Sequence, residues 1–150
     1  RKQVGLGRVA YLSVVEFDGV LPPSKPNFAI TSAFWKRPKN SKELIELIRW
    51  AADEQIPISV EGPPGLVAHA TVQLSHRRMF VHLLNYDSAK IATLHNIPVR
   101  VSLPDGATAQ SVILHAPGTD GPQRIESRQE AGTLFTVPDL HAYALITIEW

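Results

Sequence analysis

The residues from Leu66 to Trp150 form short runs in which apolar and polar side chains alternate, and turn residues separate the runs. The clearest run covers residues 97–103 and is followed by the turn sequence Pro104-Asp105-Gly106. In an extended strand its apolar members share one face: Ile97, Val99, Val101 and Leu103. This two-residue period predicts an antiparallel sheet with one face buried and the other in water.

The same pattern recurs often enough to predict seven strands in this part of the chain. They cover residues 66–75, 79–86, 97–103, 109–116, 123–127, 133–137 and 142–149. Short strands at this spacing, with turn signals between them, are typical of an immunoglobulin-like sandwich. We therefore expect a mainly β fold built on a seven-stranded antiparallel β-sandwich.

The segment before these strands has a different character. Residues 8–15 are almost continuously apolar, which favours a strand buried on both faces in an α/β sheet. Residues 18–39 form a long irregular loop, and Asn40 with Glu43 then predicts a capping box that opens a helix. Pro57 places the end of this helix near Gln55. We expect this β-loop-α segment to be the remnant of an α/β domain.

Gly62-Pro63-Pro64-Gly65 is the strongest breaker of regular structure in the sequence. It predicts a boundary between a segment 1–61, which holds the strand, long loop and helix, and a C-terminal sandwich 62–150.

Composition excludes several classes of function. The chain has 150 residues with 15 basic and 14 acidic side chains, and a net charge of +1 does not indicate a nucleic-acid binder. There is no cysteine to form a disulfide or a thiolate metal site, and no apolar stretch reaches the length of a membrane span. Because the sequence starts at Arg1, we expect a longer parent protein or processing; the compartment stays open.

No catalytic centre is predicted. The acidic residues lie mostly in turns, and the six histidines lack the spacing of a helical zinc site, so we expect no catalytic residue, no metal and no cofactor. His69, His82 and His115 are expected to lie on solvent faces of strands or in satisfied hydrogen bonds. A cross-strand pair such as His69 with His82 is the one arrangement that could bind a metal.

Aromatic side chains could stack on sugar rings. Phe34 and Trp35 lie in the long loop beside lysines, and Tyr86 lies at the end of a strand next to Asn85. These four residues are the candidate carbohydrate-binding residues, although a contact between Trp35 and another domain is the favoured explanation of the loop.

Several strings resemble parts of a known family. Gly5-Leu6-Gly7-Arg8-Val9-Ala10-Tyr11-Leu12, Leu47–Ala52 and Pro57–Pro63 resemble the last strand, helix and link of the flavodoxin-like, trimerisation-type domain of β-galactosidase-like glycoside hydrolases. Phe80–Tyr86, Pro98–Pro104 and Phe135–Leu140 are similar to strands of the C-terminal sandwich of that family. The resemblance covers nearly the whole chain and departs from the family in the long insert 20–39.

The resemblance implies a role without chemistry of its own. The acid and the nucleophile of that family lie in a TIM barrel that precedes these domains, so no catalytic residue transfers to this chain. We expect a non-catalytic C-terminal region of a carbohydrate-active enzyme, whose partner is the catalytic barrel of the parent chain or of another subunit. A carbohydrate-binding module is one alternative, and a subunit of an enzyme whose catalytic barrel is on another chain is the other. Carbohydrate and a second copy of the chain are further candidate partners.

Overall fold

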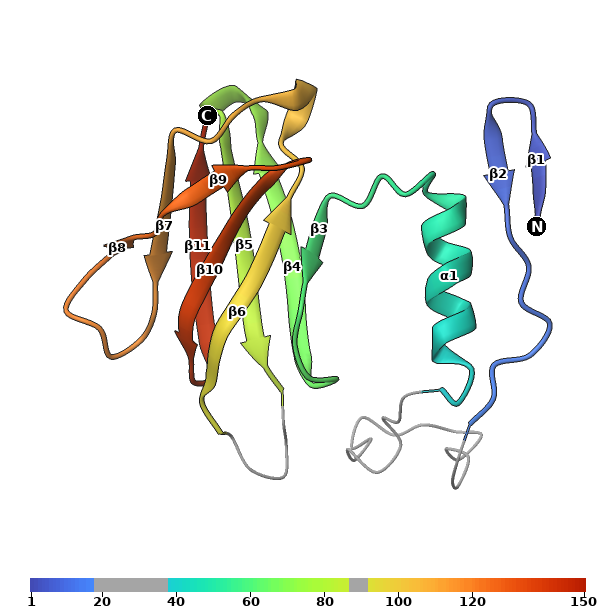
Figure 1. Cartoon of the computed structure of the whole chain (residues 1–150), viewed down its shortest axis with the longest axis horizontal. Coiled ribbons are helices and arrows are strands. Elements are labelled where there is room, and N and C mark those ends of the chain that lie inside the picture. The colour runs from blue at the N-terminus through green and yellow to red at the C-terminus, as the bar shows by residue number, and fades with distance from the viewer. Residues whose placement is uncertain (18–37, 87–91) are drawn as a thin grey trace. The chain divides into compact units, whose positions relative to one another are not determined.

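The computed structural model describes residues 1–17, 38–86 and 92–150, which separate into two compact units (Figure 1). The first unit is Arg1–Ile56 and the second is Pro57–Trp150. Within the described residues, no helix is both long enough and apolar enough to cross a bilayer.

The second unit is a sandwich of two antiparallel sheets, which confirms the predicted fold class (Figure 1). One sheet has the strand order β3-β6-β10-β9 and the other β4-β5-β11-β7-β8. The strands are β3 Ile58–Val60, β4 Leu66–Gln73, β5 Arg78–Asn85, β6 Leu94–Val101, β7 Ser111–His115, β8 Gln123–Arg124, β9 Ser127–Gln129, β10 Thr133–Leu140 and β11 Tyr143–Glu149.

The core lies between the inner faces of the two sheets, where side chains alternate in and out along each strand. In β6 and the residue pair after it, Ile97, Val99, Val101 and Leu103 are buried, as the two-residue period predicts. The partner sheet contributes Met79, Val81 and Leu83 from β5, and Ala144, Ile146 and Ile148 from β11. Burial of apolar surface at about 25 cal/mol per Å² makes this face-to-face contact the main stabilising term of the unit.

Two strand assignments differ from the sequence prediction. Residues 58–60, expected as a link, form β3, whose residues Ile58 and Val60 pair with Val101 and Val99 of β6. The single strand predicted at 123–127 is instead two short strands in different sheets. β8 pairs with β7 in the five-stranded sheet, and β9 pairs with β10 in the four-stranded sheet. Residues 125–126 therefore carry the chain from one sheet to the other, and Ile125 N–H still donates to Val112 O at 2.9 Å.

The turns follow from local conformation. Arg77 occupies the left-handed region between β4 and β5, in the gap between the strands predicted at 66–75 and 79–86. Gly132, between β9 and β10, has a φ of +120°, and a Cβ there would lie 2.7 Å from the carbonyl oxygen of Val101. Glycine is needed at this turn both for its conformation and for the close approach of β6.

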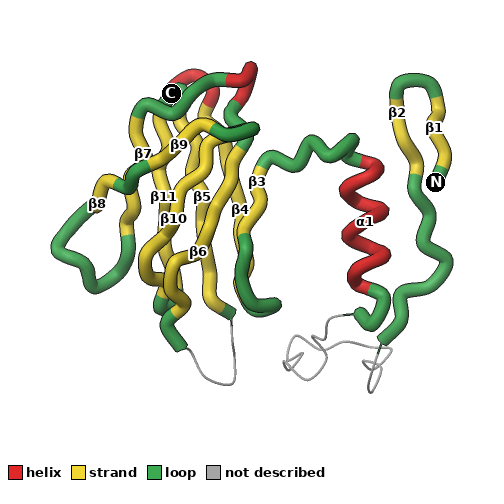
Figure 2. Tube along the Cα trace, viewed as in Figure 1, coloured by secondary structure: helices red, strands yellow, loops and turns green. Residues whose placement is uncertain are grey.

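The first unit consists of a small hairpin and one helix (Figure 2). Strands β1 Lys2–Val4 and β2 Gly7–Val9 pair antiparallel around Gly5, whose φ is +59°. The helix α1 covers Ser41–Ala51, shorter than predicted because the backbone turns into the left-handed region at Asp53 and Glu54.

The expectation of a buried strand at 8–15 is wrong for the described unit. Regular strand structure stops at Val9, and the side chains of Tyr11, Val14 and Val15 are exposed. An apolar run becomes a buried strand only when neighbouring strands pair with its backbone, and β2 pairs with β1 alone.

Asn40 also acts differently from the predicted cap. Its side chain makes no bond to the helix amides. Instead its amide donates to Val14 O at 2.9 Å, and its side-chain oxygen accepts from Glu16 N–H at 3.0 Å. Asn40 therefore ties the start of α1 to the segment that follows the hairpin.

We predict that Leu83→Ala lowers the free energy of unfolding by about 2–5 kcal/mol, because Leu83 is fully buried between the sheets. The neighbouring Leu84 points to the other face of β5 and is 39% exposed, so Leu84→Ala is the matched control with an expected loss below about 1 kcal/mol. Urea unfolding of both variants measures the difference. Equal losses would contradict the inward and outward assignment of β5.

Candidate functional site

The four candidate carbohydrate-binding residues are not brought together in the described residues. Phe34 and Trp35 lie outside them. Tyr86 follows β5 with 62% of its surface exposed, and its N–H donates to Gly65 O at 2.8 Å. Its ring is therefore free to meet a ligand or a protein surface.

Asn85 points the other way and has a structural role. It is 5% exposed, and its side-chain amide donates to Ala92 O at 2.8 Å and to His141 O at 2.9 Å. These two bonds fasten the ends of the β5–β6 and β10–β11 connections to each other. Both amide hydrogens are thus in use, and among the described candidates only Tyr86 offers its side chain to a ligand.

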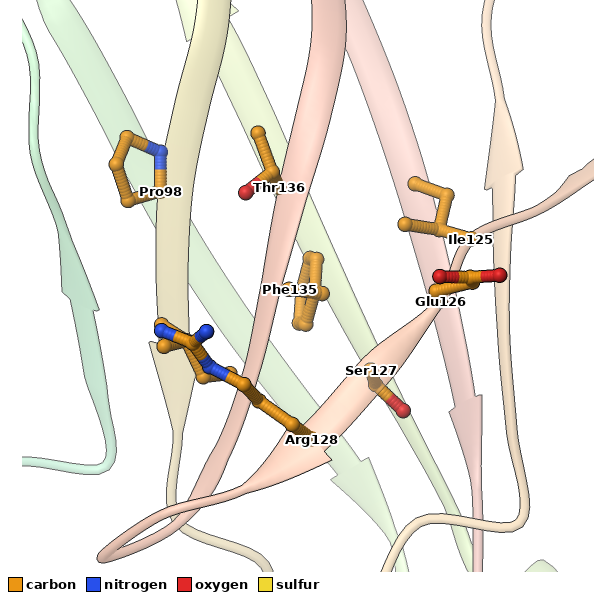
Figure 3. A pocket seen from close by; sticks show the side chains of 8 residues that line it. Pro98, Ile125, Glu126, Ser127, Arg128, Phe135 and Thr136 are labelled. Atoms are coloured by element: carbon orange, nitrogen blue, oxygen red, sulfur yellow. The ribbon is translucent and has the colours of Figure 1, made fainter.

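A hollow in the second unit has a volume of about 550 Å³ and lies over β9 and β10 (Figure 3). Its lining residues come from β6, from the link between the sheets and from β9 and β10: Pro98, Ile125, Glu126, Ser127, Arg128, Leu134, Phe135 and Thr136. Phe135 belongs to the buried core, so the hollow stops at the core and does not enter it.

The polar groups of this hollow are few. Glu126 is the single carboxylate among its lining residues, beside the hydroxyls of Ser127 and Thr136. Arg128 forms an ion pair with Glu130 at 3.0 Å, and its side chain is 69% exposed, so this pair adds little stability. In Figure 3 Arg128 extends across the surface of β10 while Glu126 lies toward Ile125.

This chemistry does not fit glycoside hydrolysis by the common route. Retaining and inverting glycosidases both use two carboxyl groups about 5–10 Å apart on opposite sides of the scissile bond. A hollow with one carboxylate, two hydroxyls and an engaged guanidinium offers hydrogen bonds to a neutral or weakly charged ligand. It supplies neither an acid–base pair nor a nucleophile with an adjacent base.

The histidines on the strands are placed as expected, on solvent faces and in hydrogen bonds. His115 Nε2 lies 3.3 Å from the hydroxyl of Thr147, and His82 Nδ1 lies 2.8 Å from the hydroxyl of Tyr143. His69 is the direct cross-strand partner of His82, and their ring centres are 6.1 Å apart. In the part of the chain that the structure describes, no group of three or more potential ligands gathers around a metal site.

In the first unit, the prominent polar contact is made by Arg8. Its guanidinium lies over the ring of Trp50 at 5.6 Å from the centroid, donates to Trp50 O at 3.1 Å and pairs with Asp53. Sequence patterning could not reveal this contact, because it joins a hairpin strand to a helix end some 40 residues later. It anchors β2 to α1.

An apolar hollow of about 370 Å³ lies beside this contact, within the first unit. Its lining residues come from the segment after β2 and from the apolar stripe of the helix: Arg8, Val9, Ala10, Leu12, Leu44, Leu47, Ile48 and Ala51. The described residues of the unit therefore cover the helix stripe only in part.

Comparisons with known proteins point to the fold. No protein-family model and no curated protein matches this sequence. Among solved structures, α-L-fucosidase isoenzyme 2 from Paenibacillus thiaminolyticus is similar over 73% of this chain, with a TM-score of 0.62 and 23% identity. A cycloisomaltooligosaccharide glucanotransferase from Paenibacillus sp., solved with cycloisomaltoheptaose, matches over 61% of this chain with a TM-score of 0.49 and 16% identity.

The chain spans only 18% of the fucosidase and 16% of the glucanotransferase. The similarity to the fucosidase therefore shows that this mainly β fold also occurs as a small part of a larger protein. At this level of identity it shows the fold alone.

We predict that Asn85→Ala destabilises the chain by about 1–3 kcal/mol, because the carbonyls of Ala92 and His141 lose their donors. Tyr86→Ala is the control on the neighbouring, exposed residue and should change the free energy of unfolding by less than about 0.5 kcal/mol. Thermal unfolding followed by circular dichroism measures both. If Asn85→Ala were as stable as the unchanged chain, the two side-chain bonds would not be holding these loops.

Proposed function

We propose that this chain is a non-catalytic accessory region of a glycoside hydrolase, which packs against the catalytic domain of that enzyme and sets its orientation. The similarity of its fold to a small part of an α-L-fucosidase supports this assignment. The sequence segments that resemble β-galactosidase-like enzymes suggest a more specific family. The fold similarity supports only the broader class of glycoside hydrolases. We therefore state the proposal at that level.

The observation that carries the proposal is the imbalance between the two units. The second unit buries a complete apolar core, whereas in the described residues of the first unit the only buried side chains are Ser41 and Leu47. Large apolar side chains that stay exposed there are Val4, Leu6, Val9, Tyr11, Val14, Val15, Phe17, Ile45 and Ile48. Of these, Val9 and Ile48 line one apolar hollow of the unit, and exposed apolar surface that gathers in this way marks an interaction site.

A catalytic domain is the partner that we propose for this surface. Each buried Val, Leu or Ile side chain contributes about 1.5–3 kcal/mol, so covering even a few of these residues stabilises an assembly substantially. A separate subunit that carries the barrel would satisfy the same surface, as would a second copy of the chain. The resemblance of residues 5–12 and 47–52 to the end of a domain next to the sandwich favours a partner within the parent enzyme.

A carbohydrate-binding module is the second candidate, and the exposed ring of Tyr86 favours it. Aromatic rings at the surface bind the apolar faces of sugars, and the remaining candidates Phe34 and Trp35 lie in the long insert. This candidate requires binding without turnover, and it is compatible with an accessory role in the same enzyme.

We predict that the 150-residue chain does not hydrolyse aryl α-L-fucosides, β-galactosides or other aryl glycosides. Release of the chromophore is measured at millimolar substrate, and Glu126→Gln controls for the single carboxylate of the hollow over β9 and β10. Turnover that Glu126→Gln abolishes would overturn the non-catalytic assignment. Calorimetric titration with oligosaccharides, using Trp35→Ala and Tyr86→Ala, separates the binding-module candidate from the purely structural one.

A second prediction concerns the covering partner. In the isolated chain Ile48 is 55% exposed, so Ile48→Asp should leave its melting temperature nearly unchanged. In the parent enzyme the same change places a charge in an apolar contact and should destabilise the assembly by about 1–3 kcal/mol. Glu46→Asp, on the same exposed helix, is the matched control. An equal response of isolated chain and parent enzyme would show that this helix face is not covered.

A further inference from the structure

We propose that His69 and His82, with Tyr143 as the residue that positions His82, form a weak binding site for a divalent cation that prefers imidazole ligands, such as Zn²⁺, Ni²⁺ or Cu²⁺. The site lies on the outer face of the five-stranded sheet and is independent of the proposed accessory role.

The strand register sets the distance between the two rings. His69 in β4 and His82 in β5 are direct partners in the antiparallel ladder, and residues in such a pair have Cβ atoms about 4.5–5.5 Å apart. Their ring centres lie 6.1 Å apart with an angle of 44° between the ring planes. Since metal–nitrogen bonds measure about 2.0–2.1 Å, a shared ion requires only a small approach of the two side chains.

The hydrogen bond to Tyr143 selects the nitrogen that binds the metal. His82 Nδ1 lies 2.8 Å from the Tyr143 hydroxyl, and Tyr143 belongs to β11, on the far side of β5 from β4. Nδ1 is thus engaged on the β11 side, which leaves Nε2 as the nitrogen of His82 that a metal shared with His69 would use. When Nδ1–H donates to the tyrosine oxygen, Nε2 presents its lone pair, which is the tautomer that a metal requires.

The surroundings favour this class of cation over others. The positions that flank the pair on β4, β5 and β11 are Val67, Leu84 and Tyr143 on one side and Thr71, Phe80 and Thr147 on the other. None of these is a lysine or arginine that would repel a cation. None is a carboxylate of the kind that Mg²⁺ and Ca²⁺ need, whereas imidazole suits Zn²⁺, Ni²⁺ and Cu²⁺.

Two protein ligands leave the remaining coordination positions to water. Such a site does not reach the closed four-ligand shell of structural zinc, so we expect a reversible, exchangeable ion and not a stable folding element. The two histidines stay accessible because His69 is exposed and His82 is only partly buried.

The test is calorimetric titration of the 150-residue chain with ZnCl₂ and NiCl₂ in a buffer that does not bind metals, with MgCl₂ and CaCl₂ as comparison ions. We expect saturable binding of one Zn²⁺ or Ni²⁺ per chain and no heat from Mg²⁺ or Ca²⁺. His69→Gln should weaken the affinity at least tenfold, and Tyr143→Phe by about tenfold, the lower end of the range for residues that orient a ligand. His76→Gln should change nothing, because His76 lies on the β4–β5 turn and bonds to Ser75.

Imidazole resonances in a ¹H–¹³C spectrum give a second readout that does not depend on the stability of the variants. Zn²⁺ should shift the signals of His69 and His82 together and leave those of His76 in place. Absence of saturable binding, binding that survives His69→Gln, or shifts confined to other histidines would each overturn the site. An affinity that Tyr143→Phe leaves unchanged would overturn the positioning role of the tyrosine.

Discussion

The structure depends on one packing constraint, the burial of alternating side chains between two facing sheets. Val99 and Val101 of one sheet and Val81 and Ile146 of the other are completely buried, and the chain has no cysteine that could form a disulfide between the sheets. A two-residue period along each strand determines which side chains enter this contact. A shift of one residue in any pairing would bring the polar face inside, so the pattern also specifies the register.

This constraint explains why the sandwich could be predicted from the sequence. Long strands such as β5, β6 and β11 have one face buried and one face toward solvent. The alternation of residue types along their sequences indicates this difference directly. Three-residue strands carry too little pattern, so β3 became visible only through its pairing with β6. The division of 123–127 into β8 and β9 depends on which sheet each half pairs with, and local sequence does not encode that choice.

The first unit shows the opposite case, because the interactions that shape it are not local. Asn40 precedes Glu43 as in a capping box, yet its side chain bonds to residues 14 and 16. The apolar run 8–15 has the composition of a buried strand, but a strand needs neighbours that complete its ladder. At Asn85 the side-chain amide, whose polarity suggested a ligand contact, donates to two loop carbonyls. The adjacent Tyr86 was placed correctly at an exposed strand end.

The contrast between the units also bears on how function is distributed along the chain. A sandwich whose core is complete can carry polar side chains on its outer faces without losing stability. His69, His82 and Tyr143 lie on such a face. The segment that exposes Leu6, Tyr11 and Ile48 is different, because burying these apolar side chains against another surface is what would stabilise it. Binding of small ligands is thus expected on the sandwich, and association with a larger partner on the hairpin and helix. The two proposals rest on different residues for this physical reason, and each can fail without the other.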